Sequence, residues 1–233
     1  MFEKQPNEVP FSGLKKTGKK GKYFEIKSVE TDPGFVVKEA KTKWGLFETA
    51  GVHPLNDIDR AKADLDIMKE DFGEFIPGTS LVVGKNEKGE KTFYAVQEKI
   101  EGQALDKVGN NEEVRQQLES FFDKVREAFK KHLFYYKNSR QPQSIFPDMK
   151  GWNFIFGTNP KRGETKSRLY FIDTYPVEGA DFNDDFINRY IPTIVKPTFP
   201  SEYWPVIDDF RMKLAEEIKQ HIKAHSDEIP RVN

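Results

Sequence analysis

The stretch Pro147-Asp148-Met149-Lys150-Gly151-Trp152-Asn153 carries the strongest chemical signal in this sequence of 233 residues. It places a carboxylate, a lysine two residues later and an amide five residues later in one loop. Phosphoryl transfer uses such a set, because it needs a base or orienting group for the acceptor hydroxyl and oxygen ligands for Mg²⁺. The spacing alone is a weak signal, since Asp148 also fits an ordinary loop residue and Asn153 a turn residue.

A second carboxylate follows downstream. Residues 154–156 and 169–172 are short apolar runs, which predict two strands joined by a polar hairpin over residues 157–168. The second strand ends at Asp173, just before residues 174–176, Thr-Tyr-Pro. The hairpin thus delivers another oxygen ligand after the first loop, with a strand-end cap as the structural alternative.

The first hundred residues have the patterns of strands and turns. Strands are predicted over residues 11–16, 23–29, 35–40, 79–83 and 91–100. Turns are predicted at Lys16–Gly21, from its glycines and lysines, and at residues 31–34, Thr-Asp-Pro-Gly. A helix of about four turns with one apolar face is predicted to begin at Asn56 as its N-cap. Together these elements predict a sheet of about five strands with one helix.

The remaining residues have mostly helical patterns. A long amphipathic helix is predicted over residues 112–134, and a last helix is predicted to begin at Ser201 as its N-cap. Residues 137–144 are predicted to form a polar loop. The sequence therefore predicts an α+β chain, with an N-terminal sheet lobe (residues 1–101) and a C-terminal helical lobe (residues 102–233).

This order of elements, with the loop from Asp148 to Asn153 and the later Asp173, resembles the protein kinase-like superfamily. The resemblance is to its small-molecule branch, which includes the aminoglycoside phosphotransferases. It implies a two-lobed kinase-like fold that binds ATP and Mg²⁺ and transfers the γ-phosphoryl group to a hydroxyl. In this comparison Asp148 is the catalytic base or orients the substrate, and Lys150 lies near the transferred phosphoryl group. Asn153 and Asp173 then bind Mg²⁺.

The N-terminal half resembles the same superfamily through Val36-Val37-Lys38, which implies that Lys38 binds the nucleotide phosphates. A solvent-facing lysine on a half-exposed strand is the structural alternative. In the superfamily this lysine pairs with an acid on the following helix. Asp64 lies roughly 80° from the centre of the apolar stripe of that helix and Asp66 roughly 120° away on its other flank. Asp64 is therefore the predicted partner and Asp66 the second choice, although aspartate is one methylene shorter than the usual glutamate.

Two further segments bear on nucleotide binding. Residues 96–105 resemble the hinge between kinase lobes, which implies that backbone groups of Glu98 and Ile100 bind the adenine edge. Gly18 and Gly21, in a lysine-rich turn, resemble a phosphate-binding glycine loop but lack its three-glycine pattern. An ordinary connection and a solvated turn are the alternatives.

Departures from the superfamily bear on the acceptor and on catalysis. Phe146 stands where a histidine is common, Thr174 and Tyr175 replace the Phe-Gly of protein kinases, and Ala-Pro-Glu is absent. These features favour a small-molecule acceptor over a protein acceptor. The missing histidine, the incomplete glycine loop and the shorter acid at position 64 leave open a pseudokinase, a nucleotide-binding or protein-binding module without catalysis.

Composition limits the class of protein further. The chain has no cysteine, 20 phenylalanines and a formal net charge of −1. Disulfide scaffolds and thiol nucleophiles are excluded, and near-neutral charge argues against bulk nucleic-acid binding. No apolar run approaches the length of a membrane span, which gives the expectation of a cytoplasmic protein without membrane contact. The charge is uneven: residues 1–43 hold ten lysines and six acids, and residues 173–186 hold five acids and no base.

Overall fold

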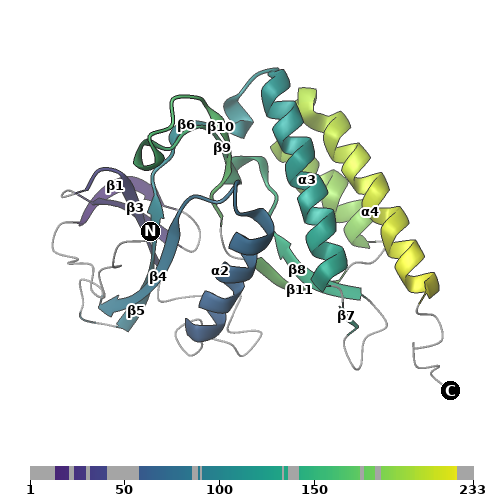
Figure 1. The fold of residues 1–233 in the computed structure, drawn as a ribbon, viewed down its shortest axis with the longest axis horizontal. Helices are drawn as coiled ribbons and strands as arrows, with labels where there is room; N and C mark the ends of the chain where they lie inside the picture. The colour runs from purple at the N-terminus through teal and green to yellow at the C-terminus, as the bar shows by residue number, and fades with distance from the viewer. Residues whose placement is uncertain are drawn as a thin grey trace. The chain divides into compact units, whose positions relative to one another are not determined.

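A computed structural model gives the fold of the chain (Figure 1). It describes residues 14–20, 24–29, 32–40, 58–85, 89, 91–132, 134–135, 142–173, 176–181 and 185–224. The chain divides into two compact units. The first, here called the sheet unit, comprises residues 1–67, 77–101 and 159–165; the second, the helical unit, comprises residues 68–76, 102–158 and 166–233.

The sheet unit is built on an antiparallel sheet of five strands in the order β1-β2-β3-β5-β4 (Figure 1). The strands are β1 (Leu14–Lys20), β2 (Phe24–Val29), β3 (Phe35–Ala40), β4 (Thr79–Lys85) and β5 (Lys91–Glu98). One helix, α2 (Ile58–Phe72), separates β3 from β4 in the chain. The predicted sheet with one helix is confirmed; Asn56, the predicted N-cap, lies outside the described residues.

The predicted turn at Lys16–Gly21 is wrong for its first five residues. Strand β1 continues through Gly18 to Lys20, and its register with β2 shifts between Lys16 and Lys20. Pairing with a neighbouring strand overrides the local turn preference here, and a bulge accommodates the extra residues of β1. Gly21 lies outside the described residues.

Apolar side chains from β3, α2, β4 and β5 form the core of the sheet unit. Buried members are Val37, Leu65, Leu81, Tyr94 and Ala95. The sheet also holds an ion pair with one buried member: Lys27 on β2 is 3% exposed, and its Nζ lies 2.5 Å from Oε2 of the partly exposed Glu39 on β3. The pairing offsets part of the cost of removing a lysine from water.

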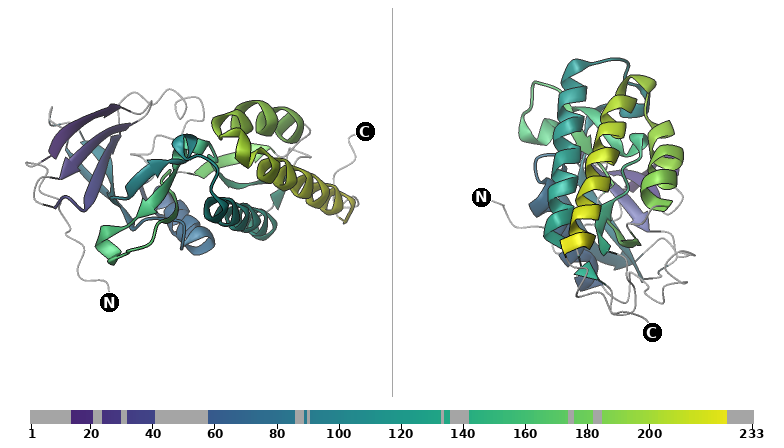
Figure 2. Two further views of the ribbon diagram at one scale, coloured as in Figure 1. Left: turned by 90° about the horizontal axis from the view of Figure 1, so that it is seen from above. Right: turned by 90° about the vertical axis from the view of Figure 1, so that its right-hand side faces the viewer.

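The helical unit contains α3 (Glu112–His132), α4 (Trp204–Ala224) and the π-helical segment η5 (Phe186–Val195). Helices α3 and α4 lie side by side (Figure 2). Two sheets of three strands accompany them, in the orders β10-β9-β6 and β11-β8-β7. Their strands are β6 (Glu101–Ala104), β7 (Phe134–Tyr135), β8 (Pro142–Pro147), β9 (Phe154–Thr158), β10 (Arg168–Phe171) and β11 (Pro176–Asp181). Among the described helices, none is long and apolar enough to cross a membrane.

Several predicted boundaries after residue 90 are wrong. Residues 142–144, predicted as loop, belong to β8, which pairs with β11 more than thirty residues later. The predicted strand 91–100 ends at Glu98, and a new strand, β6, begins at Glu101. Helix α4 begins at Trp204, after a 3₁₀ turn that starts at Ser201. For β8 the boundary follows from pairing with a strand that is distant in sequence, which a local pattern cannot reveal.

Phenylalanine rings dominate the core of the helical unit. Phe121 on α3 is fully buried, and its ring lies 4.9–6.0 Å from five other rings. Those rings belong to Phe72, Phe75, Phe122, Phe154 and Phe171. Edge-to-face and tilted rings at these distances attract one another in addition to the burial of their surface. This core holds β9 and β10, the strands that flank the candidate site.

Candidate active site

The loop from Asp148 to Asn153 lies in the helical unit between β8 and β9, and its last three residues form a 3₁₀ turn. Backbone hydrogen bonds shape it: the amide of Lys150 donates to the carbonyl of Asp148, and that of Asn153 to the carbonyl of Lys150, both at 2.8 Å. The Asn153 side chain adds a third bond, from Nδ2 to the carbonyl of Asp148, at 2.7 Å. The side chains of this loop are therefore presented from a well-bonded backbone.

Asp148 and Lys150 form an ion pair in this loop. Nζ of Lys150 donates to Oδ2 of Asp148 at 2.8 Å. Burial alone lowers the pKa of Lys150, but the hydrogen bond and the charge of Asp148 outweigh it, so this pKa lies above its usual value. The other carboxylate oxygen, Oδ1 of Asp148, is buried and has no hydrogen-bond partner. The carboxylate thus has one oxygen paired with Lys150 and one buried oxygen without a hydrogen-bond partner.

Asn153 connects this carboxylate to the one predicted further along the chain. Its Nδ2 also donates to Oδ2 of Asp173, at 3.3 Å. Antiparallel pairing of β9 with β10 sets Phe154 opposite Phe171, and the amide of Ile172 donates to the carbonyl of Asn153 at 2.8 Å. The hairpin therefore brings Asp173 next to Asn153, twenty residues earlier. Four predicted residues, Asp148, Lys150, Asn153 and Asp173, come together in this unit.

Gly151 allows the loop to pack against the segment that follows η5. Its amide donates to Oγ1 of Thr198 at 2.7 Å, and this hydroxyl in turn donates to the carbonyl of Val195 at 2.6 Å. A Cβ at position 151 would lie only 2.1 Å from the carbonyl oxygen of Thr198. Glycine is required here by close backbone approach, because no larger residue fits without a shift of the loop.

Gly151→Ala is therefore expected to lower the free energy of unfolding by about 1–3 kcal/mol, as overpacking does elsewhere. Urea denaturation measures this change. Gly109→Ala is the matched control, since a Cβ there meets no atom within 4 Å, and its effect is expected to stay within about 0.5 kcal/mol. Equal stabilities of the two variants would contradict the close approach at Gly151.

Tyr190, on η5, belongs to the same charged environment and was missed by the sequence analysis. Burial raises the pKa of its phenol; the charge of Asp148 raises it further, while Lys150 opposes the rise. The ring stacks on Phe186 with centroids 5.3 Å apart. The phenol therefore keeps its proton near neutral pH and is available as a hydrogen-bond donor. No local pattern in the sequence points to Tyr190, because only tertiary packing brings η5 to this loop.

The predicted phosphate-binding residues lie in the sheet unit. Lys38 is in β3, where it pairs with Ile26 of β2 and Ala95 of β5 and is partly exposed. On α2, Asp64 is partly buried and Asp66 is exposed. An ion pair of Lys38 with either acid remains a prediction.

Glu98, predicted to bind adenine through its backbone, also organises the sheet unit through its side chain. Its Oε2 accepts hydrogen bonds from the amide of Gly78 at 2.7 Å, Nδ2 of Asn159 at 2.6 Å and Nε of Arg162 at 3.0 Å. Asn159 and Arg162 come from the tip of the β9–β10 hairpin. Oε2 of Glu98 thus has three partners, and the amide of Glu98 donates to the carbonyl of Gly78 at 2.8 Å. That amide is therefore already used, and adenine binding by other backbone groups of Glu98 and Ile100 remains a prediction.

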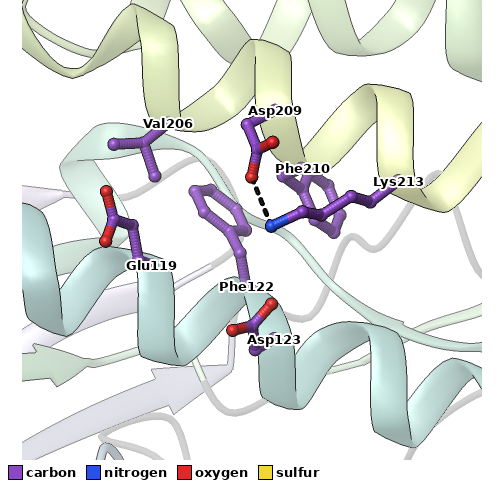
Figure 3. A pocket seen from close by; sticks show the side chains of 7 residues that line it. All are labelled: Glu119, Phe122, Asp123, Val206, Asp209, Phe210 and Lys213. Carbon is purple, nitrogen blue, oxygen red and sulfur yellow. Dashed lines mark ion pairs between the residues drawn. The ribbon is translucent and has the colours of Figure 1, made fainter.

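A hollow of about 300 Å³ lies elsewhere in the helical unit, between α3 and α4 (Figure 3). Rings of Phe122 and Phe210, stacked 4.5 Å apart, line it together with charged side chains. Lys213 is already paired with Asp209 at 2.7 Å (Figure 3). The hollow includes none of the predicted site residues.

Comparisons with known proteins give matches in structure only. No family model matches the chain, and no curated protein matches it in sequence. Similar solved structures include a Rio2 kinase–ADP/Mg²⁺–phosphoaspartate complex from Chaetomium thermophilum, with a TM-score of 0.41 and 12% identity, covering 93% of this chain and 71% of that one. WbdD bound to the kinase inhibitor LY294002 has a TM-score of 0.38 and 12% identity, covering 84% and 44%.

A second structure of WbdD, described as a bifunctional kinase-methyltransferase, has a TM-score of 0.37 and 15% identity, covering 89% and 47%. The chain thus spans less than half of either WbdD chain. The chain itself combines an antiparallel sheet containing one helix with a mainly helical part that carries the Asp148–Asn153 loop. This is the α+β architecture that the sequence predicts.

Proposed function

We propose that this protein is an ATP- and Mg²⁺-dependent phosphotransferase that moves the γ-phosphoryl group to a hydroxyl of a small-molecule acceptor. One observation carries the proposal: Asn153 donates both to the backbone of Asp148 and to the carboxylate of Asp173, while Oδ1 of Asp148 has no partner. The proposed base and the two proposed Mg²⁺ ligands would thus adjoin each other, as phosphoryl transfer requires.

Asp148 is the proposed base or orienting group. Its Oδ2 is held by Lys150, so the carboxylate cannot turn freely, and Oδ1 is the oxygen that would accept the hydrogen of the acceptor hydroxyl. Lys150 would meanwhile offset negative charge that gathers on the transferred phosphoryl group.

Asn153 and Asp173 are the proposed Mg²⁺ ligands, and their chemistry fits the ion. Mg²⁺ prefers oxygen donors and is usually bound by one or two carboxylates together with phosphates and water. Because Nδ2 of Asn153 makes both of its hydrogen bonds, its Oδ1 is left for a cation. In the described part of the chain no group of three His, Cys, Asp or Glu side chains could hold a metal, so phosphate and water oxygens must complete this site. When bound, Mg²⁺ would shield the negative charge of the phosphates.

The residues proposed to bind the nucleotide are assigned from the sequence resemblance. Lys38 would bind the phosphates and Asp64 would orient Lys38. Backbone groups of Glu98 and Ile100 would bind adenine, and the β1–β2 region containing Gly18 and Gly21 would cover the phosphates. The absence of Ala-Pro-Glu and of a long Ser/Thr-bearing activation loop favours a small molecule over a protein as acceptor.

A panel of small alcohols tests this function. ATP consumption by the purified protein is measured with Mg²⁺ and each alcohol, and thermal shift with ATP is measured with and without Mg²⁺. Acceptor-dependent consumption supports the enzyme. A Mg²⁺-dependent thermal shift without consumption supports the pseudokinase, which the burial of Oδ1 of Asp148 would explain. Absence of any shift would contradict both.

Asp173→Asn is expected to weaken Mg²⁺-dependent ATP binding by at least about tenfold, because the variant keeps the shape of the side chain but loses its charge. Thermal-shift titration with ATP at fixed Mg²⁺ measures the change. Asp123→Asn is the matched control, since Asp123 is an exposed carboxylate paired with Arg126 on α3. Unchanged ATP affinity in Asp173→Asn would show that Asp173 is not a Mg²⁺ ligand.

A further inference from the structure

Trp152 is an exposed ring within the candidate catalytic loop. Its side chain is 51% exposed, whereas the other rings near this loop, Phe154, Phe171 and Phe199, are buried. It lies in the 3₁₀ turn directly between Gly151 and Asn153, so its backbone is held by the same hydrogen bonds as the proposed catalytic groups. An exposed ring on a rigid backbone offers a large contact surface with little loss of conformational freedom on binding.

Trp152 is also linked to the proposed base through one lysine. Nζ of Lys150 lies 5.8 Å from the ring centroid of Trp152 and 2.8 Å from Oδ2 of Asp148. The ammonium thus lies within cation–π range of the ring and donates a hydrogen bond to the carboxylate. Any molecule that places a hydroxyl at Asp148 and a surface against Trp152 must pass close to this positive charge.

The position of Lys150 excludes one class of acceptor. A quaternary or primary ammonium that sought the ring of Trp152 by cation–π attraction would meet the like charge of Lys150. Lys150 carries the positive charge usual for lysine near neutral pH, and it forms an ion pair with Asp148. An uncharged acceptor pays no such penalty, and the protonated phenol of Tyr190 adds a neutral hydrogen-bond donor to the same environment.

We infer that Trp152 is the platform on which the acceptor stacks, and that the acceptor is an uncharged ring alcohol. This inference rests on the proposed phosphotransferase function. A saturated ring with several hydroxyls presents a flat C–H face to the indole and hydroxyls to its surroundings. One hydroxyl would reach the carboxylate of Asp148, whose side chain is 20% exposed, and another would accept from Tyr190. Sugars and cyclitols share this chemistry, whereas linear cationic alcohols such as choline lack it.

Fluorescence tests the platform without any need for turnover. Trp44→Phe combined with Trp204→Phe leaves Trp152 as the sole tryptophan of the chain. This variant is titrated with methyl glucoside, methyl mannoside, myo-inositol and choline. We expect a saturable change of emission with at least one ring polyol and none with choline. Comparison of the two glycosides with myo-inositol shows whether the site prefers a sugar or a cyclitol. A change with choline alone, or no change with any of the four, overturns the inference.

Kinetics with the ring polyol that supports turnover give a second test. Trp152→Ala is expected to raise the KM for that acceptor about tenfold while kcat stays within about twofold, and Trp152→Phe to restore most of the difference. Met212→Ala, which removes another exposed apolar side chain (57% exposed, on α4), is the matched control and is expected to change neither constant.

The two proposals fail in different ways. An emission change without ATP consumption keeps the platform and contradicts the phosphotransferase. Acceptor-dependent ATP consumption with an unchanged KM in Trp152→Ala keeps the phosphotransferase and overturns the platform. Consumption that is highest with choline overturns the acceptor class.

Discussion

Asp148→Asn is expected to lower acceptor-dependent ATP consumption by about 10²–10⁴-fold, the range that general acid–base groups contribute. Asparagine has nearly the same shape as aspartate, but its amide oxygen is far too weak a base to take a hydroxyl proton. The ion pair with Lys150 at 2.8 Å is lost as well, so the lysine is no longer held in place. Turnover is measured with the alcohol that gives the fastest wild-type reaction.

ATP binding separates this effect from misfolding. The residues proposed for the nucleotide lie in other segments of the chain, so the thermal shift with ATP and Mg²⁺ is expected to persist in Asp148→Asn. Asp209→Asn is the control, because Asp209 forms a comparable pair with Lys213 at 2.7 Å on α4. Undiminished consumption in Asp148→Asn would end the assignment of Asp148 as base.

Phe121→Ala is expected to have the largest effect on stability, lowering the free energy of unfolding by about 3–5 kcal/mol. The ring is fully buried at the centre of five others, and those rings come from the end of α2 and the residues just after it, from α3 itself and from β9 and β10. Removing it leaves a cavity that rigid aromatic neighbours fill poorly. Urea denaturation followed by circular dichroism measures the loss.

A conservative variant at the same position tests the cause. Phe121→Leu keeps most of the buried volume and is expected to lose clearly less stability than Phe121→Ala. Val125→Ala, one turn further along the same buried face of α3, removes fewer atoms and provides the comparison for a smaller cavity. If all three variants unfolded at the same urea concentration, Phe121 would not be the centre of this core.

Much of the fold was predictable because its signals are local. The apolar stripe of α3 repeats with the helical period, and all of its observed buried positions lie on that stripe. Strands β2, β3, β4 and β5 each follow an alternating or apolar run bounded by turn residues. Errors came where pairing with distant strands overrode local preference, as at Gly18 in β1 and at residues 142–144 in β8.

The residues of the candidate site likewise fall into those that the sequence predicts and those that it does not. Asp148, Lys150 and Asn153 were identifiable because a loop of six residues holds all three, and Asp173 because a hairpin returns the chain to it. Tyr190 and the Glu98–Asn159–Arg162 network were not identifiable. Each depends on contacts between residues that lie more than thirty positions apart, and a single sequence gives no sign of such pairs.

The sequence by itself determined the kinds of chemistry available: a carboxylate, a lysine and an amide in one loop, a later carboxylate, and no cysteine. These follow from residue type and short spacing, which covalent geometry converts directly into proximity. Only the tertiary structure decided which oxygen of Asp148 is paired and which is free, that Gly151 packs on Thr198, and that Trp152 is exposed beside Lys150. Those outcomes depend on how separate elements pack, and packing is a property of the whole folded unit.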